Sequence, residues 1–248
     1  MSLDTPLQVS RLLLATMGTR MYLSYENRIP QEGAVVVVSN HRSFMDAPLL
    51  MAAVNRPIRF ACHHYMGQVP VMREIVQQLG CFPLDTPEHR QQSFFQQAIK
   101  LLQQGQVVGI FPEGAQTMVR LTDPHKMEQF QRGFAHLALR AACGGATDTP
   151  VRNLAVLPVA IASLEESTSS GVPLRLLSLF DPSEPLFDRA GWHPLVVYRR
   201  ASVFIGRPRW ITRPAREQYQ GKHAKTVVND LLGYCQEEIA TLLRQGCF

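Results

Sequence analysis

The chain has 248 residues, which is enough for one large domain or two small ones. Hydrophobic residues make up 46% of it and charged residues 18%, an ordinary balance for a chain that buries a core, so a mainly disordered protein is excluded. The formal net charge of +5 is mild, and no run of like charges resembles a nucleic-acid-binding arm. We therefore expect no nucleic-acid partner.

The five cysteines are odd in number and widely scattered, with no Cys-x-x-Cys pair and no Cys/His spacing typical of a metal site. We therefore expect neither a disulfide framework nor a metal centre. The first residues do not read as a secretory signal, and no stretch reaches the roughly 18 apolar residues that a membrane-spanning helix needs. These features favour a cytoplasmic protein that, where it meets a membrane, lies peripherally on the cytoplasmic face.

The first expected element is a helix over residues 7–25. Its apolar residues share a broad side, so the helix is amphipathic, and Arg11 and Arg20 are placed to meet anionic lipid headgroups. Two interpretations stay open at this point. The apolar side packs on the protein's own domain, or it contacts a membrane surface.

From residue 34 onwards, short apolar runs alternate with segments of helical periodicity. The expected strands are 34–39, 58–61, 81–84, 107–111 and 154–160, and the expected helices are 43–54, 71–79, 88–104 and 129–142. After residue 173 the pattern loosens, and we expect strands near 174–179 and at 203–206 and a last helix at 225–244. This alternation predicts an α/β fold with a mainly parallel central sheet that is covered by helices on both faces.

Two polar clusters follow predicted strands, at the end of the sheet where parallel α/β folds bind their ligands. One cluster runs from Asn40 to Asp46, and the other is Pro112-Glu113-Gly114. Ser43 and Asp46 have the spacing of a capping box. The following helix is therefore expected to begin near Ser43, with His41 in the turn before it.

In that turn, the His41 ring is within reach of the Asp46 carboxylate. A carboxylate bonded to an imidazole fixes its tautomer and raises its basicity, which suits the ring to take a proton from an alcohol. The alternative is that Asp46 only caps the helix, that His41 is a turn residue and that Glu113 is a solvated loop residue. The spacing alone leaves both interpretations open.

Four blocks of the sequence form a larger pattern: Ser39 to Asp46, Gly80 to Asp85, Ile110 to Gly114 and Val156 to Ile161. In their order and gaps they resemble the glycerolipid acyltransferase family, whose best-known members are lysophosphatidate and glycerol-3-phosphate acyltransferases. The first block contains the family's HX4D motif as His41 and Asp46. The sequence shows no internal repeat and no low-complexity linker, so we expect a single acyltransferase domain over 1–248. It would comprise an N-terminal helix at 1–25, a core at 26–208 that the resemblance covers, and a C-terminal helical segment at 209–248.

The resemblance also implies a reaction. His41 would act as general base on an acceptor hydroxyl, and Asp46 would orient it. The substrate-binding residues would be Arg42, Ser43, Glu113, Gly114 and Arg132. The acyl donor would be acyl-CoA or acyl carrier protein, which is a substrate, so no cofactor is expected. The acceptor would be a glycerolipid at the membrane surface, most directly 1-acyl-glycerol-3-phosphate in phospholipid biosynthesis.

The sequence departs from the family at positions that concern the acceptor. Thr86 and Gln116 stand where family members with phosphate-bearing acceptors carry arginine. Other arginines could supply the missing charge-assisted bonds to phosphate, namely Arg42, Arg90, Arg120 and Arg132. The alternatives are a lysophospholipid or neutral alcohol acceptor, hydrolysis with water as the acceptor, or a non-catalytic lipid-binding relative.

Overall fold

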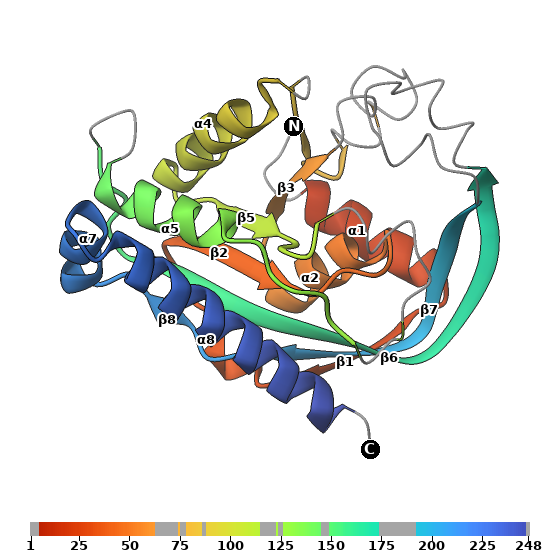
Figure 1. Cartoon of the computed structure of the whole chain (residues 1–248). Coiled ribbons are helices and arrows are strands. Elements are labelled where there is room, and N and C mark those ends of the chain that lie inside the picture. The colour runs from red at the N-terminus through yellow and green to blue at the C-terminus, as the bar shows by residue number, and fades with distance from the viewer. Residues whose placement is uncertain are drawn as a thin grey trace.

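The computed structural model describes residues 5–62, 74, 78–85, 88–114, 123, 126–144, 149–173 and 192–246. Within these residues the chain forms a central sheet with helices packed against both faces (Figure 1). This is the α/β fold that the sequence predicts. The expected helix at 71–79 lies mostly outside the described residues, and the expected strand at 174–179 lies wholly outside them.

The described residues form one eight-stranded sheet in the order β1-β7-β6-β2-β5-β3-β4, with β8 paired to β6. Its strands are β1 (Arg20–Ser24), β2 (Ala34–Ser39), β3 (Ile58–Cys62), β4 (Phe82–Pro83), β5 (Val107–Ile110), β6 (Leu154–Pro173), β7 (Trp192–Ile205) and β8 (Arg209–Trp210). Strand β6 pairs antiparallel with β7 and β8, whereas the other pairs are parallel. The carboxyl ends of β2, β3 and β5 therefore meet at one edge of the sheet, where a ligand site is expected.

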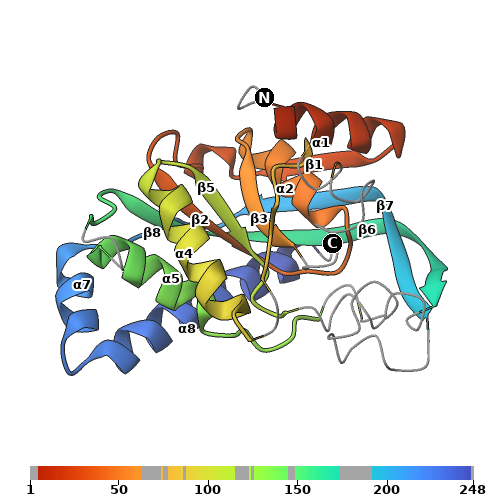
Figure 2. The ribbon, with the colours of Figure 1, turned by 90° about the horizontal axis from the view of Figure 1, so that it is seen from above.

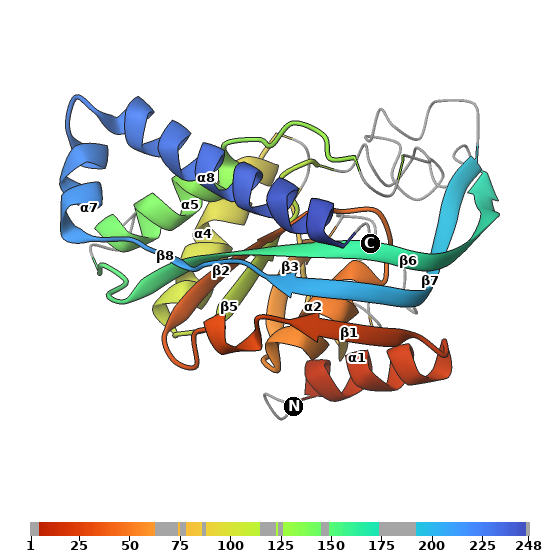
Figure 3. The same ribbon diagram turned by 90° about the horizontal axis from the view of Figure 1, so that it is seen from below.

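Two helical layers enclose the sheet. The helices are α1 (Thr5–Thr16), the 3-10 helix η1 (Glu26–Arg28), α2 (Asp46–Val54), α4 (Arg90–Gln103), α5 (Gly133–Cys143), α7 (Arg213–Gln220) and α8 (Ala224–Gln245). Helices α1 and α2 lie on one side and α4, α5 and α8 on the other, as Figures 2 and 3 show. In β2, Val36 and Val38 pack toward α4, α5 and α8, while Val35 and Val37 pack toward α1 and α2. Each fully buried valine contributes about 1.5–3 kcal/mol, so this strand needs both layers.

The N-terminal segment departs from the single helix expected over 7–25. Helix α1 ends at Thr16, Gly18 turns the chain with a φ of 67°, and the next residues form β1 parallel to β7. Met21, which belonged to the expected apolar side of the helix, instead points inward from this strand together with Leu23. The prediction was wrong here because pairing with a distant strand overrides local helical periodicity.

Strands β6 and β7 are much longer than the predicted strands at 154–160 and 203–206, because they run for 20 and 14 residues. Beyond the sheet they continue as a two-stranded arm that curves away from the core (Figure 1). Residues 163–170 are mainly serine, threonine and glutamate, so no apolar pattern marked a strand there. Backbone pairing with β7 makes this polar stretch a strand, and it carries side chains to the carboxyl edge of the sheet.

Candidate active site

Asn40 opens the β2–α2 turn (residues 40–45) and ties it to β6. Its amide nitrogen donates to the Ile161 carbonyl oxygen at 2.9 Å, and its amide oxygen accepts the Ile161 N–H at 2.9 Å. The side chain thus continues the pairing of β2 with β6 after the strand has ended. The turn therefore leaves the sheet from a fixed point.

His41 and Asp46 lie in contact, with His41 Nδ1 2.9 Å from Asp46 Oδ2. The same oxygen accepts the backbone N–H of Arg42 at 2.7 Å and that of Ser43 at 2.8 Å. The Asp46 side chain is only 1% exposed, and these donors offset the cost of burying its charge. Because Nδ1–H is directed at the carboxylate, Nε2 of His41 keeps its lone pair for a reacting group.

Helix α2 begins later than the capping-box spacing predicted. It starts at Asp46, and Met45 before it has helical φ and ψ and no side-chain cap. The Ser43 hydroxyl instead donates to the Val196 carbonyl oxygen in β7 at 2.6 Å and accepts the Met45 N–H at 3.1 Å. The predicted start near Ser43 was wrong, because the Asp46 N–H binds the Ser43 carbonyl oxygen at 3.1 Å in a turn and does not bind the hydroxyl as a capping box requires. Substrate binding by the buried Ser43 stays a prediction.

Glu113, in the turn after β5, binds backbone on two sides. Its Oε1 accepts the His41 N–H at 2.9 Å, and its Oε2 accepts the Glu128 N–H at 2.7 Å. Burial raises the pKa of this carboxyl, while the two N–H groups oppose the rise. Gly114 follows with a φ of 80°, which favours glycine. Glu113 thus braces the His41 segment from the β5 side, and substrate contact by Glu113 or Gly114 stays a prediction.

The wild-type protein is expected to lose stability relative to a Glu113→Gln variant as the pH rises from about 4 to about 7. Burial raises the pKa of Glu113 in the folded state. Its contribution to stability is therefore fully present below the unfolded pKa of about 4.3 and is lost as the pH rises through the folded value. Glutamine does not titrate. Urea unfolding of both proteins across this range measures the difference, and a constant difference in the free energy of unfolding would contradict the prediction.

Aromatic rings cover one face of His41. Phe111 stacks on the imidazole with centroids 3.9 Å apart and planes 10° apart, and Phe60 stacks on Phe111 with centroids 5.2 Å apart. Gly109 in β5 leaves the room that Phe60 occupies, because a Cβ atom there would lie 2.1 Å from Phe60 Cε1. This series of contacts holds the plane of the His41 ring from the side of the sheet.

A Gly109→Ala substitution is expected to lower the free energy of unfolding by about 1–3 kcal/mol, because the added methyl group displaces Phe60. Chemical denaturation measures the change. Gly233→Ala in α8 is the matched control, since no described atom lies within 4 Å of a Cβ there. Alanine in this helix interior is expected to stabilise by about 0.5–1 kcal/mol. Equal stabilities of Gly109→Ala and wild type would contradict the close packing of β5 on Phe60.

Arg42 follows His41 and forms an ion pair with Glu166 of β6. Its Nη2 lies 2.5 Å from Glu166 Oε1, and its Nε lies 3.3 Å from Oε2, so two nitrogens of the guanidinium engage the carboxylate. The two side chains are 9% and 17% exposed. The structure therefore places the Arg42 charge beside a carboxylate, and substrate binding by Arg42 stays a prediction.

Two residues at the site have no sequence signal that predicts them there. Glu166 binds Arg42, and the Tyr198 hydroxyl donates to Asp46 Oδ1 at 2.9 Å. Glu166 and Tyr198 face one another in the register of β6 and β7. No local motif predicts them, because only the long-range pairing of β6 with β7 brings them to the site.

The remaining predicted residues lie farther along the chain or outside the described part. Arg132 is exposed at the start of α5, and Arg90 begins α4. Thr86, Gln116 and Arg120 lie outside the described residues. In the described part of the chain, no cluster of three or more His, Cys, Asp or Glu side chains is placed to hold a metal ion. None of the helices in that part is both long and apolar enough to cross a membrane.

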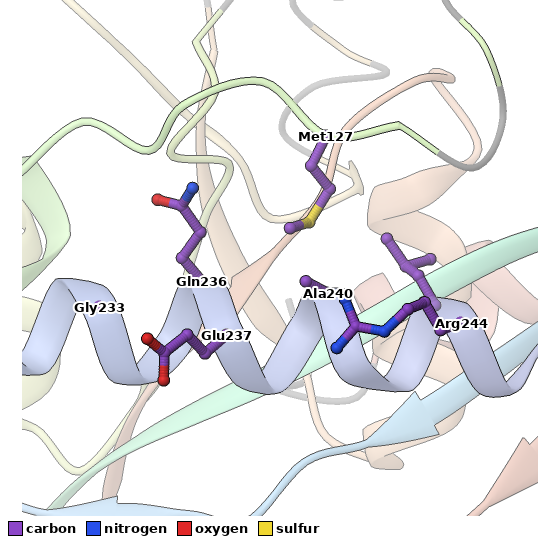
Figure 4. Close-up of a pocket in the computed structure, with 7 residues that line it drawn as sticks. Met127, Gly233, Gln236, Glu237, Ala240 and Arg244 are labelled. Carbon is purple, nitrogen blue, oxygen red and sulfur yellow. The ribbon is translucent and has the colours of Figure 1, made fainter.

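A groove of about 590 Å³ lies between α8 and the segment that carries Met127 (Figure 4). Its lining residues are Met127, Gly233, Gln236, Glu237, Ala240, Leu243 and Arg244. Figure 4 shows Met127 reaching toward the helix, and the Phe130 N–H donates to Gln236 Oε1 at 3.4 Å. Met127, which lines the groove, is followed in sequence by Glu128, whose N–H binds Glu113.

Comparison with known proteins decides the family. The family model described as Acyltransferase matches residues 20–162, which is more than half of the chain. The chain belongs to the Acyltransferase family. The matched part of this acyltransferase contains the β2–α2 turn, Asp46 and Glu113.

Two relatives match this acyltransferase over only part of their length. An uncharacterised protein of Mycobacterium tuberculosis is 29% identical over 188 residues, covering 69% of this chain and 47% of that protein. The 1-acyl-sn-glycerol-3-phosphate acyltransferase of Borreliella burgdorferi is 22% identical over 131 residues, covering 52% of this chain and 50% of that protein. The chain thus spans about half the length of the curated relatives it matches.

The fold of this acyltransferase is similar to a solved structure. The crystal structure of the 1-acyl-sn-glycerophosphate acyltransferase PlsC from Thermotoga maritima matches with a TM-score of 0.62 and 16% sequence identity. The match covers 98% of this chain and 78% of that chain. At this identity the likeness establishes the shared fold and not the substrate.

Proposed function

We propose that this acyltransferase moves a fatty acyl group from acyl-CoA or acyl carrier protein to a hydroxyl of a glycerolipid, most directly 1-acyl-glycerol-3-phosphate in phospholipid biosynthesis. The observation that carries the proposal is the bond between His41 and Asp46 at the carboxyl edge of the sheet. A histidine held in this way presents a basic Nε2 to an alcohol. The names of the B. burgdorferi relative and the T. maritima structure support this acceptor class.

The reaction follows from the free Nε2 of His41. This nitrogen takes the proton of the acceptor hydroxyl as the oxygen attacks the thioester carbonyl carbon. The Asp46 charge stabilises the imidazolium that forms. The tetrahedral intermediate collapses, the C–S bond breaks, and the imidazolium returns the proton to the departing thiolate. The products are an ester and a thiol, no cofactor takes part, and general base catalysis supplies about 10²–10⁴-fold.

The described cysteines support a mechanism without a cysteine nucleophile. Burial raises the pKa of Cys62 to about 12 and that of Cys81 to about 11. Both side chains are therefore thiols at neutral pH, and the nucleophilic form of cysteine is the thiolate. Direct transfer between donor and acceptor is the simpler course.

A neutral or zwitterionic acceptor is the second candidate, such as a lysophospholipid or a neutral alcohol. The observation that favours it is the ion pair of Arg42 with Glu166, because Arg42 is the cation next to His41 in sequence and its charge is already matched. A phosphate monoester would have to compete with the Glu166 carboxylate for the same guanidinium. The two candidates therefore differ in what Arg42 contacts.

We propose that the acceptor meets the enzyme at the cytoplasmic membrane face, with α1 against the headgroups. Leu7 and Leu14 of α1 pack into the core beside α2, whereas Leu12 on its other side is 65% exposed. Tyr22 of the neighbouring β1 is also exposed. Because the apolar side of α1 packs on the protein's own core, only its outer side, which carries Leu12, is left to contact the membrane in this proposal.

An acceptor panel tests the proposed function. The purified chain is incubated with isotope-labelled acyl-CoA or acyl carrier protein and with 1-acyl-glycerol-3-phosphate, a lysophospholipid, a long-chain alcohol or no acceptor. Mass spectrometry is expected to find labelled phosphatidate. Labelled ester from only the lysophospholipid or the alcohol would support the second candidate. Thiol release at the full rate without acceptor, or lipid binding without any transfer, would overturn acyl transfer to a lipid.

A further inference from the structure

The two oxygens of the Asp46 carboxylate have different partners. Oδ2 accepts the His41 Nδ1–H and the backbone N–H groups of Arg42 and Ser43. Oδ1 accepts the hydroxyl of Tyr198 at 2.9 Å. The side-chain donor to Oδ1 therefore comes from β7, about 150 residues away in sequence, and not from the turn itself.

Strand β7 contacts the β2–α2 turn at two points and the first residue of α2 at a third. The Val196 carbonyl oxygen accepts the Ser43 hydroxyl at 2.6 Å, and the Tyr198 N–H lies 3.4 Å from Met45 Sδ. The third contact is the Tyr198 hydroxyl on Asp46. Tyr198 is 2% exposed and packs among the residues of the α1 and α2 side of the core. A ring held this firmly defines where its hydroxyl lies.

Glu166 and Tyr198 form one cross-strand pair of the arm, and both contact the segment that holds His41. Tyr198 lies opposite Glu166 in the β6–β7 register, and Glu166 binds Arg42. In this cross-strand pair, Glu166 thus holds the side chain of Arg42, and Tyr198 holds the Asp46 carboxylate that binds His41. This arrangement joins the arm to the β2–α2 turn by side-chain bonds, in addition to the sheet.

We infer that Tyr198 is a positioning residue that holds the Asp46 carboxylate and thereby sets the orientation and basicity of the His41 ring. The inference rests on the proposed function in one respect, namely that His41 acts as the base. It concerns a residue that touches neither acceptor nor donor in that mechanism. Its role is to keep both oxygens of a buried carboxylate bonded.

The Tyr198 hydroxyl stays protonated at neutral pH and so donates a hydrogen bond to Asp46. Burial, and then the neighbouring Asp46 carboxylate, raise the pKa of the Tyr198 hydroxyl well above its usual range. The hydroxyl dipole places its positive end on Oδ1 and so offsets part of the carboxylate charge that His41 feels. In the part of the chain that the structure describes, Arg42 of the turn, Glu166 of β6 and Glu113 after β5 also face this site. Arg42 and Glu166 are paired with each other, so their charges oppose one another. The Tyr198 hydroxyl is neutral, and its dipole changes the electrostatic potential at the His41–Asp46 pair.

Tyr198→Phe tests the inference because it removes only the hydroxyl. The kinetics are measured with the acceptor that gives a labelled ester in the acceptor panel described above. We expect kcat to fall about tenfold, because the Asp46 carboxylate and the His41 ring that it orients are no longer held in one position, with KM changed less than about twofold. The acidic limb of the pH–rate profile is expected to move to higher pH by about 0.5 unit, since the carboxylate charge is no longer offset. Tyr219→Phe is the matched control, because that hydroxyl lies 3.0 Å from His136 Nδ1 on another part of the fold.

A second readout does not depend on turnover. The chain has eight histidines, so the ring signals of isotope-labelled protein are assigned by comparison with a His41→Ala sample. In NMR titrations, the midpoint of the His41 ring is expected to move to higher pH in Tyr198→Phe and to stay in place in Tyr219→Phe. A residue with only a packing role would lower the stability without moving this midpoint.

The outcomes separate the inference from the proposed function. Unchanged kcat together with an unchanged His41 titration in folded Tyr198→Phe would overturn the inference. Absence of acyl transfer with every acceptor would overturn the proposed function, while the titration would still judge the role of Tyr198. If Tyr198→Phe does not fold, 3-fluorotyrosine at position 198 keeps the ring and is the stronger donor. It is expected to move the His41 midpoint to lower pH, and a midpoint that does not move would overturn the inference.

Discussion

Replacing His41 by alanine is expected to lower the rate of acyl transfer by about 10²–10⁴-fold, the contribution of a general base. The fold is expected to survive, because the backbone N–H that Glu113 accepts is still present in alanine. Asp46 also keeps its bonds from the turn and from Tyr198. The rate is measured as thiol release, with mass spectrometry of the ester product.

His41→Gln is the matched control for this loss. Its amide N–H can still donate to Asp46, but the side chain does not take a proton at neutral pH. We therefore expect a rate as low as that of His41→Ala, together with stability closer to wild type. Transfer by either variant at close to the wild-type rate would show that another group removes the proton.

Replacing Asp46 is expected to separate the charge of the carboxylate from its hydrogen bonds. In Asp46→Asn, the amide oxygen can take the place of Oδ2 and accept the N–H groups of Arg42 and Ser43. The amide nitrogen then faces the Tyr198 oxygen, whose hydrogen can rotate away. The rate is expected to fall by about 10²–10⁴-fold, because neutral asparagine does not stabilise the imidazolium. The free energy of unfolding is expected to fall by only about 1 kcal/mol.

Asp46→Ala removes the acceptor altogether. It leaves two backbone N–H groups, the Tyr198 hydroxyl and the His41 ring nitrogen facing a cavity. Because these groups are largely buried, the free energy of unfolding is expected to fall by about 3–5 kcal/mol. Chemical denaturation compares the two variants. Similar stabilities of the alanine and asparagine variants would mean that Asp46 does not organise the turn.

The His41–Asp46 contact was predictable because both residues lie in one short turn. Five valine and alanine positions from residue 34 formed a strand buried on both faces, and polar residues came directly after it. A parallel sheet presents such residues at its carboxyl edge whatever the rest of the chain does. Even here, one local prediction failed, because α2 begins at Asp46 and not near Ser43, whose hydroxyl donates to β7.

Glu113 shows where the sequence reaches its limit. Its position after β5 predicted that it would lie near His41, and its carboxylate does accept the His41 N–H. The second bond, to Glu128, depends on how a later segment returns across the site. Residue spacing predicts which residues are neighbours along one helix or strand. It does not predict which backbone N–H binds the second oxygen of the Glu113 carboxylate.

The sequence by itself determined the α/β class, the central parallel strands and the cluster around His41, because local periodicity and strand ends carry that information. The tertiary structure alone decided that the segment after Thr16 becomes β1 and that a polar stretch becomes the arm. It also decided that Glu166 and Tyr198 meet the turn. These features rest on pairing between residues far apart in the chain, and the stability of such pairs comes from their partners and not from their own local pattern.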